Sequence, residues 1–204
     1  MCGRYYLKIS IDKLLEKYGI INNEFDDIPV GEIFPSQQAP IIFNKQDIKM
    51  RLSKWGLSPS YLKRPIINAR AETLDKKKTF KGLFDKKRCL IPVSGFFEWK
   101  NQNGTKIKHS IYLENREFFS LAGLYESSLD SSGNRITEFV IITTAANKKI
   151  SEIHNRMPLI LSEDKEQEWL NNDTEKKQIK NILKPYPDDK IVLEPEKDQL
   201  GFDF

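Results

Sequence analysis

The chain has 204 residues, of which 39% are hydrophobic and 11% aromatic, so it can build a core and is not a disordered segment. Its 33 basic and 29 acidic residues leave a formal net charge of +4, which permits nucleic-acid binding without arguing for it. The N-terminus MCGRYYLKIS lacks the apolar core of a secretory signal, and no apolar run is long enough to span a bilayer. We therefore expect a single cytoplasmic domain over residues 2–204, with its thiols reduced.

The first predicted element is a helix over residues 10–18. Its apolar residues recur at helical spacing, with Ser10 as the N-cap and Gly19 as the stop; they are Ile11, Leu14, Leu15 and Tyr18. The prolines and glycine of the next stretch, 22–40, predict a loop.

Strand signals dominate the middle of the chain. Seven short runs are rich in β-branched and aromatic residues and are bounded by turn signals: 41–43, 48–53, 89–93, 96–99, 107–113, 118–124 and 139–144. Asn103-Gly104 predicts a hairpin turn between two of them, and Ser132-Gly133-Asn134 predicts another turn.

Three further helices and one late strand complete the prediction. The helices cover 79–86, the stretch after the N-cap Ser162, and a segment beginning near Asp173; the strand covers 191–193. Together these elements predict an α+β fold, one domain with a mostly antiparallel, barrel-like β core and peripheral helices.

Cys2 is the first residue with distinctive chemistry. Because cysteine is small, we expect Met1 to be removed, which leaves Cys2 with an α-amine and a thiol on adjacent carbons. The α-amine has an ordinary pKa of about 7.7–8.0, against about 10.4 for lysine, so it is far more often a free base near neutral pH. This pair can condense with an aldehyde to a Schiff base and then close a five-membered thiazolidine ring. The alternative is an incidental, buried cysteine.

Asn68, Arg70 and Glu72 occupy alternate positions and would share one face of an extended segment. An amide can hold a polar substrate group, and a guanidinium can hold an anion such as phosphate. The alternative is an Arg–Glu pair on a solvated strand edge.

Glu98 lies inside an aromatic strand, so it should point away from the face of Phe97 and Trp99. A carboxyl group beside aromatic surface suits general acid–base work. The alternative places Glu98 on the wet face of a half-buried strand.

His154 and Arg156 bring an imidazole and a cation close together before a proline. Histidine titrates near neutral pH, and Arg156 could bind phosphate. His109 lies between strand residues and is interpreted as structural or exposed. A structural role for His154 is the alternative.

A metal site is not expected. The two cysteines, Cys2 and Cys89, and the two histidines, His109 and His154, are not paired at the spacings typical of zinc ligands. We expect neither a metal nor another cofactor.

In combination, several motifs resemble one family, the SOS response-associated peptidase (SRAP) proteins, which sense abasic sites in DNA. The resemblance runs from Cys2 to about Trp169. In chain order the motifs are MCGRY at the start, WGL at 55–57, NARAET at 68–73, RCLIPVSGFFEW at 88–99, LAGLYE at 121–126, FVIITTAAN at 139–147 and HNRMPLIL at 154–161.

The resemblance implies a single α+β domain with a positively charged groove for single-stranded DNA, covalent capture of abasic sites, and no membrane partner. Implied catalytic residues are Cys2, Asn68, which holds the open sugar, Glu98, which moves protons at the α-amine, and His154, which assists sugar opening. Implied DNA-binding residues are Arg4, Pro35, Trp55, Arg70, Thr143, Thr144, Arg156 and Met157, with the arginines on phosphates and Pro35 and Trp55 against bases.

The implied chemistry is the thiazolidine reaction of Cys2. A Schiff base at C1′ invites β-elimination and strand cleavage, so residual lyase activity is expected, whereas ring closure by the thiol removes the iminium and shields the lesion. A monomer is expected, associated with the nucleoid when bound to DNA. Two alternatives stay open: a thiol peptidase or hydrolase with an N-terminal nucleophile, and a single-strand binding module without a covalent step.

Overall fold

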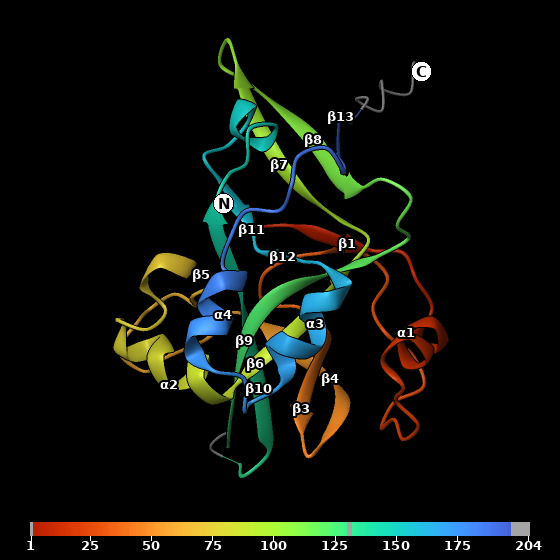
Figure 1. The fold of residues 1–204 in the computed structure, drawn as a ribbon, viewed down its shortest axis with the longest axis vertical. Helices are drawn as coiled ribbons and strands as arrows, with labels where there is room; N and C mark the ends of the chain where they lie inside the picture. The colour runs from red at the N-terminus through yellow and green to blue at the C-terminus, as the bar shows by residue number, and fades with distance from the viewer. Residues whose placement is uncertain (1, 130–131, 197–204) are drawn as a thin grey trace.

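The computed structural model describes residues 2–129 and 132–196; Met1, whose removal is expected, lies outside them. Figure 1 shows strands in the middle of the molecule and helices around them, which confirms the α+β prediction. The described strands are β1 (Tyr5–Leu7), β2 (Gly31–Ile33), β3 (Gln38–Lys45), β4 (Asp47–Trp55), β5 (Asn68–Arg70), β6 (Arg88–Val93), β7 (Gly95–Gln102), β8 (Thr105–Leu113), β9 (Phe119–Leu129), β10 (Arg135–Ala145), β11 (Arg156–Pro158), β12 (Ile160–Leu161) and β13 (Ile191–Pro195). The described α-helices are α1 (Ile11–Tyr18), α2 (Lys78–Lys86), α3 (Glu163–Leu170) and α4 (Lys176–Ile182).

Five strands close into a barrel. β10 pairs with β4, β4 with β3, β3 with β6, β6 with β9, and β9 returns to β10. Only β4 and β5 run parallel to their partner β10, so the described pairings are mostly antiparallel, as predicted. Side chains on both faces of these strands, such as Ile42, Leu90 and Phe139, are fully buried.

A second sheet has the order β13-β8-β7-β1-β2. In Figure 1 its strands β7 and β8 extend above the barrel. The Tyr5 ring of β1 lies 5.1 Å from the Trp55 ring of β4, so aromatic packing joins this sheet to the barrel. The two sheets therefore meet where the chain begins.

The predicted helices and turns are largely confirmed. Gly19 ends α1 with a φ of 62°, a left-handed conformation that glycine adopts without strain. Asn103 and Gly104 both have positive φ, as a tight β7–β8 hairpin turn requires. α4 begins at Lys176 rather than near Asp173. None of the described helices is long and apolar enough to cross a membrane.

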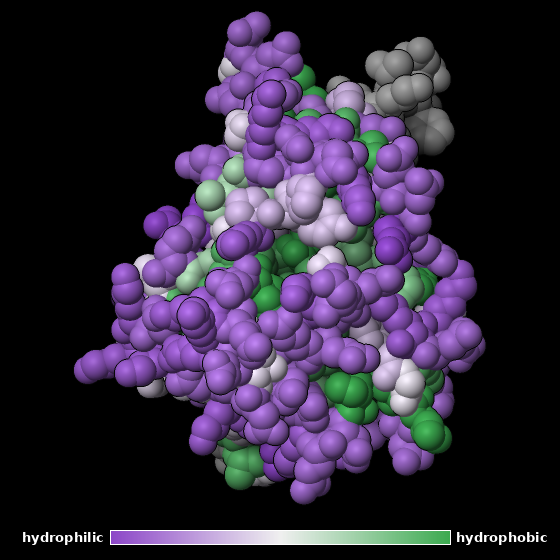
Figure 2. Space-filling view, in the orientation of Figure 1, coloured by the Kyte–Doolittle hydropathy of each residue, from purple (hydrophilic) through white to green (hydrophobic). Residues whose placement is uncertain are grey.

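The predicted loop over 22–40 is wrong in part, because Gly31–Ile33 forms β2 and β3 begins at Gln38. β1, β5, β11 and β12 were also not predicted. Each of these strands has two or three residues, so its conformation is set by the strand it pairs with rather than by a local pattern. On the face of the molecule seen in Figure 2, most of the surface residues are hydrophilic.

Arg88, at the start of β6, links two helix ends. Its side chain is 5% exposed and donates to the carbonyls of Phe84 and Asp85 in α2, and to those of Trp169 and Asn171 at the end of α3. A helix C-terminus leaves carbonyls without intrahelical donors and carries partial negative charge, so one buried guanidinium stabilises both ends.

Replacing Arg88 with alanine should leave these carbonyls without their charged donor. We expect Arg88→Ala to lower the free energy of unfolding by about 3 kcal/mol or more, measured by urea denaturation. Arg88→Lys keeps the charge but not the forked geometry and should recover only part of the loss. A wild-type midpoint for Arg88→Ala would contradict this assignment.

Candidate active site

Cys2 lies at the joint between the two sheets, just before β1. Its side chain is 0% exposed, and Asn68 Nδ2 of β5 donates to the Cys2 carbonyl at 2.9 Å. The Cys2 thiol lies 4.0 Å from the carbonyl oxygen of Arg4, and the N–H of Phe97 donates to that same carbonyl at 2.9 Å. The second residue of the chain is thus buried, as the incidental alternative expected, but polar groups from β5 and β7 surround it.

Glu98 is the charged group that acts on this thiol. Burial raises the pKa of the Cys2 thiol well above its usual value, and the nearby Glu98 carboxylate raises it further. Glu98 is 4% exposed, so the alternative of a solvated Glu98 is wrong. A buried carboxyl group therefore lies within electrostatic reach of Cys2.

Asn68 presents an unused acceptor at the same place. Its Oδ1 atom is buried, and no described residue hydrogen-bonds to it. A buried carbonyl oxygen without a hydrogen-bond donor is unfavourable, so Asn68 is suited to accept a hydrogen bond from a hydroxyl group of a bound molecule.

Arg70 of β5 and Arg156 of β11 lie on two strands that both pair with β10. β5 ends at Arg70, and Glu72 lies in a 3-10 turn, so the predicted extended face of Asn68, Arg70 and Glu72 is wrong at Glu72. Glu72 instead accepts two bonds from Arg156, at 2.6 and 3.0 Å. The Arg156 hydrogen bond, and more weakly Arg70, lower the pKa of Glu72. Both guanidinium groups therefore gather around one exposed carboxylate.

His154 is fixed by its own loop. The backbone N–H of Arg156 lies 2.9 Å from His154 Nδ1, and the carbonyl oxygen of Arg156 lies 3.1 Å from the same nitrogen, so the Arg156 backbone holds the ring in place. His109 is a different case: it is 8% exposed, lies opposite Glu98 in the β7–β8 register, and its Nδ1 is 3.0 Å from the Ile107 carbonyl. The buried position favours the structural interpretation of His109.

Arg4 follows Cys2 by two residues and lies directly before β1. Its guanidinium stacks on the rings of Phe34 and Trp99, 4.3 and 5.1 Å from their centroids, and pairs with Glu32 at 3.2 Å. Pro35 is partly exposed in the connection that follows Phe34. Glu32 and Phe34 were missed by the sequence analysis because they fall in the stretch interpreted as a loop.

Four residues expected to bind DNA have buried side chains, so only backbone contacts, which the resemblance implies for Thr143 and Thr144, are compatible with their positions. They are at most 4% exposed: Trp55, Thr143, Thr144 and Met157. The Trp55 indole is enclosed by Tyr5 and Phe139 and donates to the Ile67 carbonyl, so it has no free face for a base. The carbonyl of Thr143 accepts a bond from Arg156 at 2.6 Å.

Comparison with known proteins places this geometry in context. The profile of the family described as SOS response associated peptidase (SRAP) matches residues 1–201. The abasic site processing protein YoqW of Bacillus subtilis is 38% identical over 93% of this chain and 89% of its own length. The abasic site processing protein YedK of Escherichia coli is 29% identical over 89% of this chain and 85% of its own.

A solved structure supports the fold. A crystal structure of a Bacteroides thetaiotaomicron protein superimposes with a TM-score of 0.87 at 28% identity, and covers 97% of this chain and 93% of that one.

The raised thiol pKa has a direct consequence for alkylation. Because the thiolate is the reactive form, we expect carboxymethylation of Cys2 to accelerate with pH and to reach no plateau below about pH 9. Glu98→Gln removes a negative charge beside the thiol and should move the profile to lower pH. Peptide mapping separates Cys2 from Cys89, whose pKa is raised by burial alone and which serves as the internal control. A Cys2 profile with a plateau near pH 8 would contradict the assignment.

Proposed function

This chain belongs to the SRAP family, and on that premise we propose that it processes abasic sites in single-stranded DNA by covalent capture through Cys2. The observation that carries the proposal is the setting of Cys2: a thiol at the second position of the chain, beside the buried Glu98 carboxyl and held by Asn68. The ring-opened sugar of an abasic site presents an aldehyde at C1′, the group with which a 1,2-aminothiol reacts.

The reaction begins at the Cys2 α-amine once Met1 is removed. The amine adds to the C1′ aldehyde, and loss of water gives an imine. The thiol sulfur then adds to the same carbon, and its proton ends on the nitrogen. The ring that forms contains both atoms of Cys2, and one water has left in total.

Glu98 is the proton carrier in this scheme. As a carboxylate it accepts a proton from the α-amine when the amine attacks, and as an acid it returns the proton to the departing hydroxyl. Its burial beside the thiol supports the role, because a water-poor site strengthens its interaction with the charges that form.

Asn68 and His154 act on the sugar. The Oδ1 atom of Asn68 accepts a hydrogen bond from a hydroxyl group of the open sugar. His154, which the Arg156 backbone holds in place, donates a proton to the ring oxygen as the closed sugar opens.

DNA phosphates bind the arginines on either side of Cys2. Arg4, Arg70 and Arg156 lie on β-strands or directly beside them, and two of the three are paired with carboxylates at the surface, Glu32 and Glu72. The Arg4–Glu32 pair is partly exposed, and an ion pair of this kind is worth only about 0–1 kcal/mol, so a phosphate can replace its carboxylate. Pro35, partly exposed near Arg4, contacts a base beside the lesion.

A thiol peptidase has weaker support. Such an enzyme needs a thiolate nucleophile, whereas burial and Glu98 both raise the pKa of the Cys2 thiol. The covalent-capture scheme does not require a thiolate in the first step, because the amine attacks first.

Replacing Cys2 with alanine should separate the two steps. The variant keeps an N-terminal amine, so we expect it to form a Schiff base that borohydride traps on an oligonucleotide with one abasic site, but no adduct that survives denaturation without borohydride. Wild-type protein should give the stable adduct in both conditions.

Cys89→Ala is the matched control, since it removes the other thiol and leaves the N-terminal pair intact. A stable adduct with Cys2→Ala, or its loss in Cys89→Ala that is still folded by circular dichroism, would reject the role of Cys2.

A further inference from the structure

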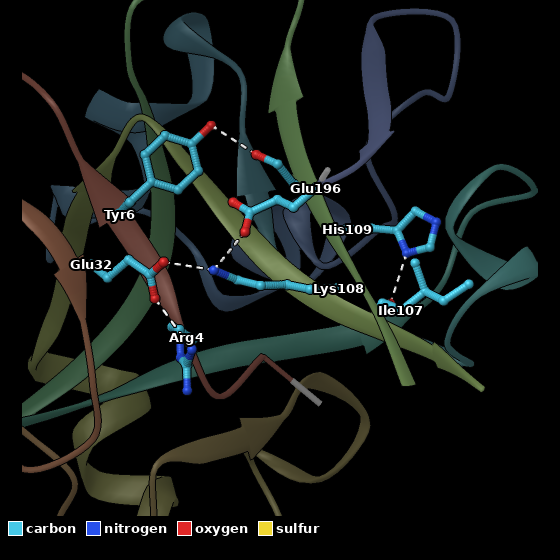
Figure 3. Close-up of polar contacts among 8 residues, drawn as sticks. Arg4, Tyr6, Glu32, Ile107, Lys108, His109 and Glu196 are labelled. Carbon is cyan, nitrogen blue, oxygen red and sulfur yellow. Dashed lines mark hydrogen bonds and ion pairs between the residues drawn. The ribbon is translucent and has the colours of Figure 1, made fainter. Parts of the chain in front are cut away.

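The outer face of the five-stranded sheet carries a row of alternating charges next to Arg4. Figure 3 shows Glu32 between Arg4 and Lys108, and Lys108 between Glu32 and Glu196. Glu32 Oε1 lies 2.6 Å from Lys108 Nζ, and its Oε2 lies 3.2 Å from Arg4. One carboxylate therefore bridges two cations, Arg4 directly before β1 and Lys108 of β8.

The Lys108 side chain packs on the aromatic ring of Phe97. Its Nζ lies 3.8 Å from the centroid of the Phe97 ring, and Lys108 is directly opposite Trp99 in the β7–β8 register. Tyr6 packs on the same Phe97 ring and lies against Gly95, where a Cβ would collide with the Tyr6 hydroxyl. The Lys108 ammonium group thus packs on an aromatic ring, and the side chain as a whole is 21% exposed.

The second carboxylate on Lys108 comes from the end of the described chain. We call residues 191–196, which comprise β13 and Glu196, the C-terminal arm. The arm pairs with β8, and the Glu196 N–H donates to the Lys108 carbonyl at 2.9 Å. The Glu196 carboxylate then lies 2.8 Å from Lys108 Nζ. Glu194, opposite Ser110, adds a second negative charge to this edge.

We propose that Arg4 and Lys108 form a phosphate-binding site on this face, and that Glu196 of the C-terminal arm is an intramolecular competitor that DNA displaces. The inference rests on the proposed function, which supplies the DNA. The bridging Glu32 carboxylate shows the geometry that the site accepts: two oxygens of one anion, each on a different cation. A phosphate diester offers the same pair of oxygens.

The surroundings favour a nucleic acid over a free anion. Phe34, 38% exposed, and Trp99 flank Arg4, so apolar rings lie next to the two cations. Aromatic side chains beside cations are the arrangement that binds single strands without sequence preference. The Glu196–Lys108 pair is partly exposed, with side chains at 40% and 21%, so displacing it is inexpensive.

The test measures non-covalent binding of an undamaged single-stranded oligonucleotide, by fluorescence anisotropy over a series of salt concentrations. Glu196→Gln should bind roughly threefold more tightly at low salt, because the competitor is weakened. Lys108→Gln should bind several-fold more weakly, and its salt slope should fall by about 0.7, the value for one lost phosphate contact on a single strand. In the double variant the Glu196→Gln gain should disappear.

Two matched controls remove the same charges elsewhere. Glu114→Gln removes an exposed carboxylate at the end of β8, and Lys106→Gln removes an exposed cation two residues before Lys108; neither residue has an ion pair with a described residue. Each control should change the affinity by less than about twofold, as expected for charges outside the contact. The proposal is overturned if Glu114→Gln tightens binding as much as Glu196→Gln, or if the Glu196→Gln gain persists without Lys108.

The outcome is independent of the proposed covalent step. Adduct formation by the wild-type protein on an abasic oligonucleotide tests Cys2, whereas the undamaged oligonucleotide offers no aldehyde. If the protein forms the adduct but Glu196→Gln has no specific effect on binding, the role of Glu196 as a competitor is rejected and the proposed covalent capture still stands.

Discussion

The burial of the N-terminal segment between the barrel and the second sheet is the constraint on which the rest of the site depends. A chain terminus is ordinarily exposed and mobile, but here Cys2 is 0% exposed and its carbonyl is held by Asn68. β1, only three residues long, is fixed between β2 and β7. These contacts bring a residue at the very start of the chain into the same small volume as Glu98 and Asn68, which lie far along the sequence.

Pairing with carboxylates is the common state of the surface arginines around this volume. Arg4 is paired with Glu32, and Arg156 with Glu72. Such pairs keep the guanidinium groups oriented without DNA, and a phosphate offers the same pair of oxygens as each carboxylate. The surface is therefore prepared for a polyanion although the formal net charge is only +4. This explains why the overall charge of the sequence carried so little information about the ligand.

The fold was predictable from sequence where a local pattern decided it. α1, the Asn103-Gly104 turn and the long strands of the barrel follow from periodicity and turn chemistry. β1 and β5 could not be predicted in this way, because two- and three-residue strands exist only through their partners. The barrel closure through the β9–β10 and β4–β10 pairings likewise has no local signal.

The candidate site was predictable in its chemistry but not in its environment. Glu98 was recognised from its aromatic neighbours, and it is buried in β7. The burial of Trp55 could not be inferred, because an aromatic residue before a glycine fits a base-stacking role and a core role equally well. Lys108 and Glu196 were not singled out, since their meeting depends on the pairing of β13 with β8.

The most direct test of the central claim compares two forms of the protein that differ only in Met1. Intact mass is measured under denaturing conditions, without reductant, after mixing each form with a single-stranded oligonucleotide that bears one abasic site. The account predicts an adduct heavier by the oligonucleotide less one water for the form that begins at Cys2, and no stable adduct for the form that retains Met1, because its α-amine is not on Cys2. A stable adduct of equal yield in both forms, or none in the form that begins at Cys2, would contradict it.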